Sequence, residues 1–221
     1  MNEISSEQSV TNALISAGEK YAQSIHELDL MLESIITTEE AEKFNHLDTE
    51  EATMSFLYMN IGISAYILGA DKKINQKEID TFLNLFGELL DDMTPESILD
   101  FVKQSTEDID KRGKDADLFN SYSVFMNRFF CWADLCKNSK LVDYKLNELY
   151  ELNNLLIFSA LRFSIECILA DDEVNDNEKE AIKNIAKIFL EIYTSHLSSS
   201  KKEDIDKLAN TIIDKVFEII E

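Results

Sequence analysis

An internal repeat constrains the fold of this chain more than any other feature. Residues 63–86 align without a gap on residues 163–186, at an offset of one hundred residues. Each copy combines an apolar segment, a short acidic turn and a segment with apolar residues at helical spacing. Because neither copy could bury its apolar segment alone, we expect the two helical hairpins to pack together in one domain. The identical pairs are Ser64/Ser164, Ala70/Ala170, Asp71/Asp171, Asn75/Asn175, Glu78/Glu178 and Asn84/Asn184.

The composition favours an all-α fold. Five glycines and one proline among 221 residues are too few for the many turns of a β-sandwich or barrel. The apolar spacing predicts a bundle of about seven or eight helices. We expect a helical extension over residues 1–47 and one helical domain over residues 48–221, with the two hairpins at about 50–90 and 150–195.

Local signals predict where individual helices begin. Thr94 is a predicted N-cap and Pro95 the first helical residue, where its missing N–H costs nothing. Ser200 and Glu203 form a candidate capping box for the last helix. The predicted helices cover approximately residues 9–36, 49–69, 76–90, 95–110, 117–136, 143–170, 176–196 and 200–220.

The charge of the chain excludes several classes of ligand. Its 21 basic and 43 acidic residues give a net charge of −22, which would repel nucleic acids and anionic membrane surfaces.

Residues 54–70 carry no charge, but they are short for a membrane span and contain Asn60, Gly62 and Ser64, so we expect a buried helix. The three cysteines form no CxxC pair and the N-terminus lacks a signal-peptide pattern, so we expect a cytoplasmic protein.

The two acidic turns have two interpretations. Asn75 with Glu78, and Asn175 with Glu178, have the spacing of capping boxes at helix N-termini. Alternatively, the carboxylates hold Ca²⁺ or Mg²⁺, since hard cations need several oxygen ligands. The second turn is richer in acids, whereas Lys72 and Lys73 offset the first, and the spaced carboxylates that begin an EF-hand loop are missing. The candidate ligands are Asp71, Glu78, Asp171, Asp172, Asp176 and Glu178.

The segments ILGADKKINQKE and ILADDEVNDNEKEAI resemble the doubled acidic signature A-D-G-x-[VI]-[SD]-x-x-E-E of the TerB-like tellurite-resistance family. The resemblance covers about residues 50–95 and 150–195, and the chain has Lys72 and Asp172 where the family has glycine. It implies an all-helical, pseudo-symmetric protein with an acidic surface, linked to tellurite and other chemical stress or to phage and colicin resistance. It also implies metal binding at the turns and no defined catalytic reaction. The positions carried over are Asp71, Asn75, Glu78, Asp171, Asn175 and Glu178.

Residues 119–132 hold the main concentration of aromatic side chains. Most of them are expected in the core, with Phe130 and Trp132 as a candidate patch for a partner or for a homodimer. The histidines are far apart, and no nucleophile motif is present.

We therefore expect a non-enzymatic protein that requires no cofactor and binds a protein partner through a basic surface on that partner. The alternatives are an accessory subunit of an anti-phage complex, or a metal-dependent hydrolase with Asp171, Asp172 and Glu178 as ligands.

Overall fold

The computed structural model describes residues 6–33, 49–86, 94–135, 174–195 and 205–220, together with a subset of residues 145–165. Every regular element in these residues is a helix, as predicted from the composition. The elements are α1 (Ser6–Glu33), α3 (Thr49–Leu68), α4 (Gln76–Phe86), α5 (Pro95–Arg112), α6 (Asn120–Leu135), α8 (Asp176–Thr194) and α9 (Ile205–Ile220), with short 3₁₀ helices at Gly113–Asp115 and Asp117–Phe119. The described residues between 145 and 165 are also helical.

The predicted starts of α3, α4, α5 and α8 agree with the structure. Helix α1 begins at Ser6, three residues before its predicted start, and α6 begins at Asn120, after a 3₁₀ helix over the predicted start at residue 117. Thr94 caps α5, because its side chain accepts from the Ser97 backbone N–H while Ser97 Oγ accepts from the Thr94 N–H. Pro95 is the first residue of that helix. The capping box predicted at Ser200 and Glu203 lies outside the described residues.

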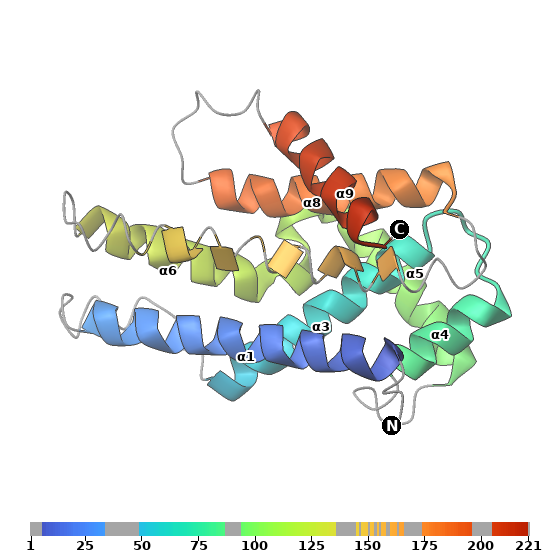
Figure 1. Cartoon of the computed structure of the whole chain (residues 1–221), viewed down its shortest axis with the longest axis horizontal. Coiled ribbons are helices and arrows are strands. Elements are labelled where there is room, and N and C mark those ends of the chain that lie inside the picture. The colour runs from blue at the N-terminus through green and yellow to red at the C-terminus, as the bar shows by residue number, and fades with distance from the viewer. Residues whose placement is uncertain are drawn as a thin grey trace.

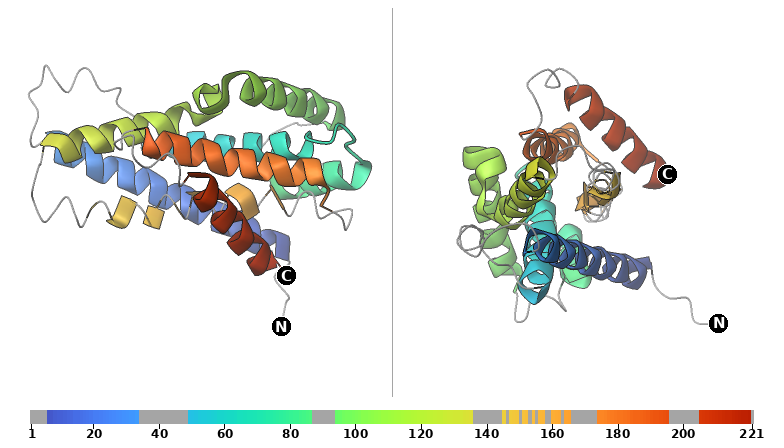
Figure 2. Two further views of the ribbon diagram at one scale, coloured as in Figure 1. Left: turned by 90° about the horizontal axis from the view of Figure 1, so that it is seen from above. Right: turned by 90° about the vertical axis from the view of Figure 1, so that its left-hand side faces the viewer.

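Helix α3 is the centre of the fold. It contacts α1, α5, α6 and α8, and Figures 1 and 2 show it between α1 and α8. Residues 56–69 are buried except for Tyr58, which confirms the prediction of a buried helix for this uncharged segment. No helix in the described part of the chain is long and apolar enough to cross a bilayer.

Helix α1 belongs to the same core as the helices that follow it. Leu14, Tyr21 and Ile25 are buried against the rest of the protein, and α1 contacts α3, α4 and α6. The predicted extension over residues 1–47 therefore packs into the bundle through α1. Its predicted boundary falls in residues 34–48, outside the described residues.

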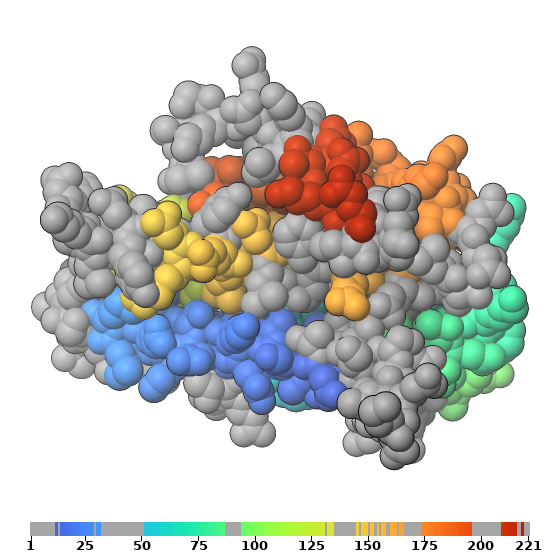
Figure 3. All heavy atoms as spheres, viewed as in Figure 1, coloured from blue at the N-terminus to red at the C-terminus, as the bar shows by residue number. Residues whose placement is uncertain are grey.

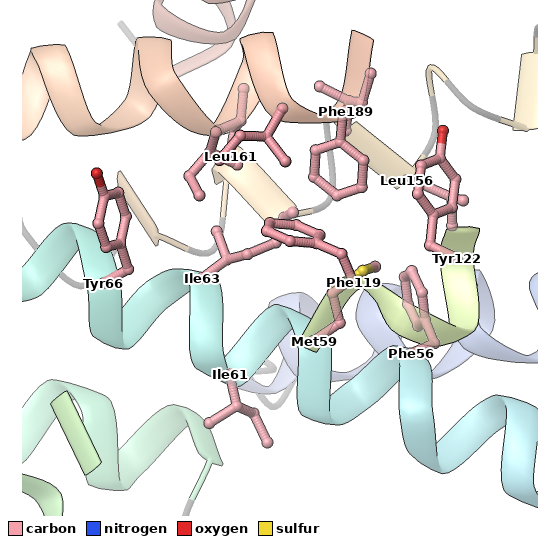
Figure 4. Packing of buried hydrophobic residues seen from close by; sticks show 14 of the residues in the cluster. Phe56, Met59, Ile61, Ile63, Tyr66, Phe119, Tyr122, Leu156, Leu161 and Phe189 are labelled. Carbon is pink, nitrogen blue, oxygen red and sulfur yellow. The ribbon is translucent and has the colours of Figure 1, made fainter. Parts of the chain in front are cut away.

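The core joins the two halves of the chain. In the close-up of Figure 4, Ile63 of α3 lies near Leu161, while Phe119 lies between α3 and Phe189 of α8. The rings of Phe119 and Phe189 meet edge to face, with 5.6 Å between their centroids. Apolar burial of this kind is the main force holding the hairpins together.

The aromatic residues of α6 are mostly buried, as the sequence predicted. Trp132, however, is only 1% exposed and packs on Phe129, so it belongs to the core and not to a surface patch. Its position seven residues after Phe125 puts both on the same inward face of the helix. Phe130 is partly buried and contacts Tyr193 of α8.

Candidate functional site

The first acidic turn joins α3 to α4 through a left-handed residue. Lys72 has φ of 62°, a conformation that glycine adopts without strain. Asp71 supports this turn, since its Oδ1 accepts a hydrogen bond from the Lys73 backbone N–H at 2.7 Å. The chain therefore forms a tight turn here, with a lysine at the left-handed position.

Both turns end in a capping box. Glu78 Oε2 accepts from the Asn75 N–H at 2.7 Å, and Asn75 Oδ1 accepts from the Glu78 N–H at 3.1 Å. The second turn repeats this geometry, with 2.8 Å from Asn175 N to Glu178 Oε2 and 3.1 Å from Glu178 N to Asn175 Oδ1. The two glutamates are 3% and 2% exposed, so each supports its helix N-terminus from inside the protein.

The two turns contact each other. The Asn175 side-chain amide donates to Asp71 Oδ2, with 3.2 Å between the two atoms. Both oxygens of Asp71 therefore accept hydrogen bonds, one from its own turn and one from the other copy of the repeat. The same residues that cap helices thus also bring the two acidic turns together.

The structure places four of the six candidate metal ligands. Asp71, Glu78 and Glu178 use their oxygens in the hydrogen bonds described above, and the Asp176 side chain extends into solvent. Among the described residues, no three acidic, histidine or cysteine side chains are grouped to hold a metal ion. Asp171 and Asp172 lie outside the described residues.

A second polar cluster connects the hairpins beside the turns. The Tyr66 hydroxyl donates to Asp110 Oδ1 of α5 at 3.3 Å and accepts from the Asn184 amide of α8 at 2.9 Å. Burial raises the pKa of Tyr66, the hydrogen bond from Asn184 lowers it, and nearby Asp110 raises it further. Sequence reasoning noted Asn184 only as a repeat identity. The role of Asp110 could not be predicted from local sequence, because the residue that donates to it, Tyr66, is 44 residues away.

The described contacts give the turns a structural role, as caps and as a link between the hairpins. In the described part of the turns, Lys72 and Lys73 are exposed at the first turn, and Asp176 is exposed at the second. Comparisons with models of protein families, with curated proteins and with solved structures find no match to this chain.

Proposed function

We propose that this chain is a TerB-like binding protein of the chemical-stress or phage-defence response, which acts without catalysis by presenting an acidic surface to a basic protein partner. The net charge of −22 is the observation that carries the proposal. A charge of that size attracts a basic surface over distances of about 10 Å at moderate salt and speeds the encounter with it.

The pseudo-twofold arrangement belongs to the same proposal. Three contacts support it, because each joins one copy of the repeat to the other: Ser64 to Ser164, Asp71 to Asn175, and Tyr66 to Asn184. The first of these joins equivalent residues, which are expected to meet near an axis that relates two copies. The two copies also have the same local geometry, because each has a capping box at the corresponding position of its turn.

The outward face of α5 carries more acidic than basic side chains. Glu96, Asp100 and Glu107 are exposed along this face, opposite the buried side that carries Ile98, Val102, Ser105 and Ile109. Asp110 follows on the same face, and Lys103 and Lys111 offset part of the charge. Since helical spacing aligns these acids in one row, a basic groove or helix on a partner could contact several of them at once.

A divalent cation at the turns fits the described residues poorly, because Asp71, Glu78 and Glu178 already accept hydrogen bonds. The Ca²⁺ or Mg²⁺ hypothesis therefore depends on Asp171 and Asp172. Calorimetric titration of each ion into the wild-type chain and into Asp171→Asn/Asp172→Asn tests it. Binding that the double substitution abolishes supports a cation site, and heats that it leaves unchanged remove the ion from the proposal.

The partner hypothesis is tested with the affinity-tagged full chain. A protein that copurifies stoichiometrically is identified, and its dissociation constant is measured by interferometry at about 0.05 M and about 0.5 M salt. We expect a partner with a basic surface whose affinity falls as salt rises. A stoichiometric partner with an acidic surface, or an affinity independent of salt, would contradict the proposal.

A further inference from the structure

Two exposed apolar side chains lie next to each other on helix α3. Among the described residues, four large apolar side chains are exposed: Leu30, Met54, Tyr58 and Leu99. Met54 and Tyr58 are both 56% exposed and lie one helical turn apart, so they share one face of α3. Single exposed apolar residues are ordinary on soluble proteins, whereas a contiguous group of them is a feature of interaction surfaces.

Helix α5 adds a third apolar side chain to this pair. The rings of Tyr58 and Phe101 meet edge to face, with 5.9 Å between their centroids. Phe101 is half-buried, so part of it is also accessible. We call Met54, Tyr58 and Phe101 the apolar face. It ends one turn after Tyr58, at Gly62, where a Cβ atom would lie 3.5 Å from Leu118 Cδ2.

The apolar face is on the side of α3 that is turned away from α1. Thr53 and Phe56 approach Gly18 of α1, whereas Met54 and Tyr58 occupy the opposite helical positions. Figure 2 shows α3 between α1 and α5, and in Figure 3 α1 covers the side toward the viewer, where little of α3 is visible. The exposed part of α3 is therefore beside α5.

Acidic side chains border the apolar face on both helices. Helix α3 begins with two glutamates and contains no basic residue. One of them, Glu51, is exposed and lies about one turn before Met54 on the same face. On α5, exposed Asp100 directly precedes Phe101 and belongs to the acidic outward face of that helix. A segment that covers the apolar face thus meets negative charge on both sides.

The basic residues of α5 are not placed to offset these acids. Lys103 follows Phe101 by two residues, which puts it on nearly the opposite side of the helix. Lys111 and Arg112 are about three helical turns farther along. Arg112 also forms ion pairs with two aspartates, at 3.2 Å and 2.7 Å.

We propose that the apolar face and the neighbouring acids bind one amphipathic segment of the partner, in which an apolar side chain is flanked by lysine or arginine. The apolar side chain packs on Met54, Tyr58 and Phe101, and the flanking cations contact Glu51 and Asp100. Apolar centres with charged rims, and aromatic anchors, are typical of protein interfaces. This inference rests on the proposed function, because it describes how the same basic partner is recognised.

Photocrosslinking identifies the segment that covers the apolar face. In the full chain, p-benzoylphenylalanine replaces Met54 or Tyr58, and in the matched control it replaces Leu30, which is 54% exposed on α1. The cells that naturally produce the protein are irradiated, and the crosslinked peptide is sequenced. We expect an adduct from position 54 or 58, and none from position 30, with a peptide that contains apolar residues flanked by lysine or arginine.

The crosslinked partner is then purified, and its affinity for the chain is measured at several salt concentrations. Met54→Ala/Tyr58→Ala should weaken binding at least about fivefold, whereas Leu30→Ala should change it less than about twofold. Because the double substitution removes no charge, the loss should be the same at low and at high salt. Circular dichroism and urea unfolding establish that each variant folds.

The inference is overturned if neither position 54 nor position 58 gives an adduct, if the crosslinked peptide is not basic, or if position 30 gives as much adduct. Wild-type affinity of folded Met54→Ala/Tyr58→Ala would also overturn it. A basic partner that binds in a salt-dependent way but fails these tests rejects the apolar face and leaves the proposed function intact. A partner with an acidic surface, or a salt-independent affinity, rejects the proposed function itself.

Discussion

The hydroxyl groups of Ser64 and Ser164 meet in the buried centre of the protein, with 3.3 Å between their Oγ atoms. Ser164 donates its own proton to the Ala160 carbonyl oxygen at 2.8 Å, so the proton between the two serines comes from Ser64. Corresponding residues of the two repeats thus form one hydrogen bond at the interface of the hairpins. This polar pair lies in a core that is otherwise mostly apolar.

The direction of this hydrogen bond predicts that replacing the two serines by alanine lowers the free energy of unfolding by unequal amounts. Ser164→Ala leaves the buried Ser64 donor without an acceptor and should lower the free energy of unfolding by about 1–3 kcal/mol. Ser64→Ala removes that donor and should cost about 0.5–1.5 kcal/mol. The double substitution should cost less than the sum, as measured by urea unfolding. Strictly additive losses would show that the two hydroxyls do not interact.

The link between the turns predicts that Asn175→Asp destabilises the protein. Aspartate caps a helix as well as asparagine does, so the cap at α8 is retained. The amide that donates to Asp71 is replaced by a second carboxylate, and we expect a loss of about 1–2 kcal/mol near neutral pH. The loss should shrink as the pH is lowered, because protonation removes the repulsion.

The rescue of this variant is the decisive control. Asp71→Asn in the Asn175→Asp background restores one amide and one carboxylate, and should recover most of the lost stability. Chemical denaturation of all four forms measures the coupling. If Asp71→Asn only adds to the loss, the contact between the turns contributes nothing to stability.

Close packing of Gly69 predicts a steric penalty at the end of α3. A Cβ atom there would lie 2.6 Å from Val102 Cγ1 and 2.8 Å from Thr106 Oγ1 of α5. Gly69→Ala should therefore cost about 1–3 kcal/mol. Gly62→Ala is the matched control, because its Cβ would lie 3.5 Å from the nearest atom, and the helical alanine should be neutral or stabilising. Equal thermal midpoints for the two variants would contradict this account.

The sequence predicted those parts of the fold that depend on local signals. The caps at Thr94, Asn75 and Asn175 need only residues within one helical turn, and the structure confirms all three. The contact from Asn175 to Asp71 could not be predicted, because it depends on how two distant hairpins pack.

The candidate sites were less predictable than the helices. The aromatic run makes Trp132 a candidate for a surface patch, but in the structure Trp132 is buried in the core. Trp132 also lines a cavity that is formed by side chains of α1, α6 and the 145–152 region together. Lys145 in that region donates a hydrogen bond to Glu27, which is 118 residues away in the sequence. No pattern within one helix contains that information.

The acidic face of α5 predicts a localised loss of partner binding. Neutralising Glu96, Asp100 and Glu107 together should weaken association with the proposed basic partner and reduce the salt dependence of its affinity. The control neutralises Glu19, Asp80 and Glu191, three exposed acids on α1, α4 and α8, and changes the net charge equally. Interferometry with the copurified partner compares them. Equal losses of partner affinity in both triple variants would show that the net charge of the chain causes the effect and that α5 has no special role.

Buried tyrosines predict that the protein loses stability in alkaline solution. Burial raises the pKa of Tyr21 and of Tyr122 above the ordinary value of 10.0, with a small opposing effect on Tyr21 from its hydrogen bond to Ser121. A raised pKa means that the unfolded chain loses its phenol protons first. The contribution to stability is therefore complete below about pH 10 and is lost as the pH rises toward the folded-state pKa values.

Tyr21→Phe should reduce this alkaline loss. The variant gives up the hydrogen bond to Ser121, so it should be slightly less stable near neutral pH, yet its free energy of unfolding should fall less steeply above about pH 10. Tyr58→Phe is the control, because Tyr58 is 56% exposed. Urea unfolding at about pH 8 and about pH 11 measures the slopes. If Tyr21→Phe and Tyr58→Phe lose stability equally with pH, burial of Tyr21 does not cause the alkaline sensitivity.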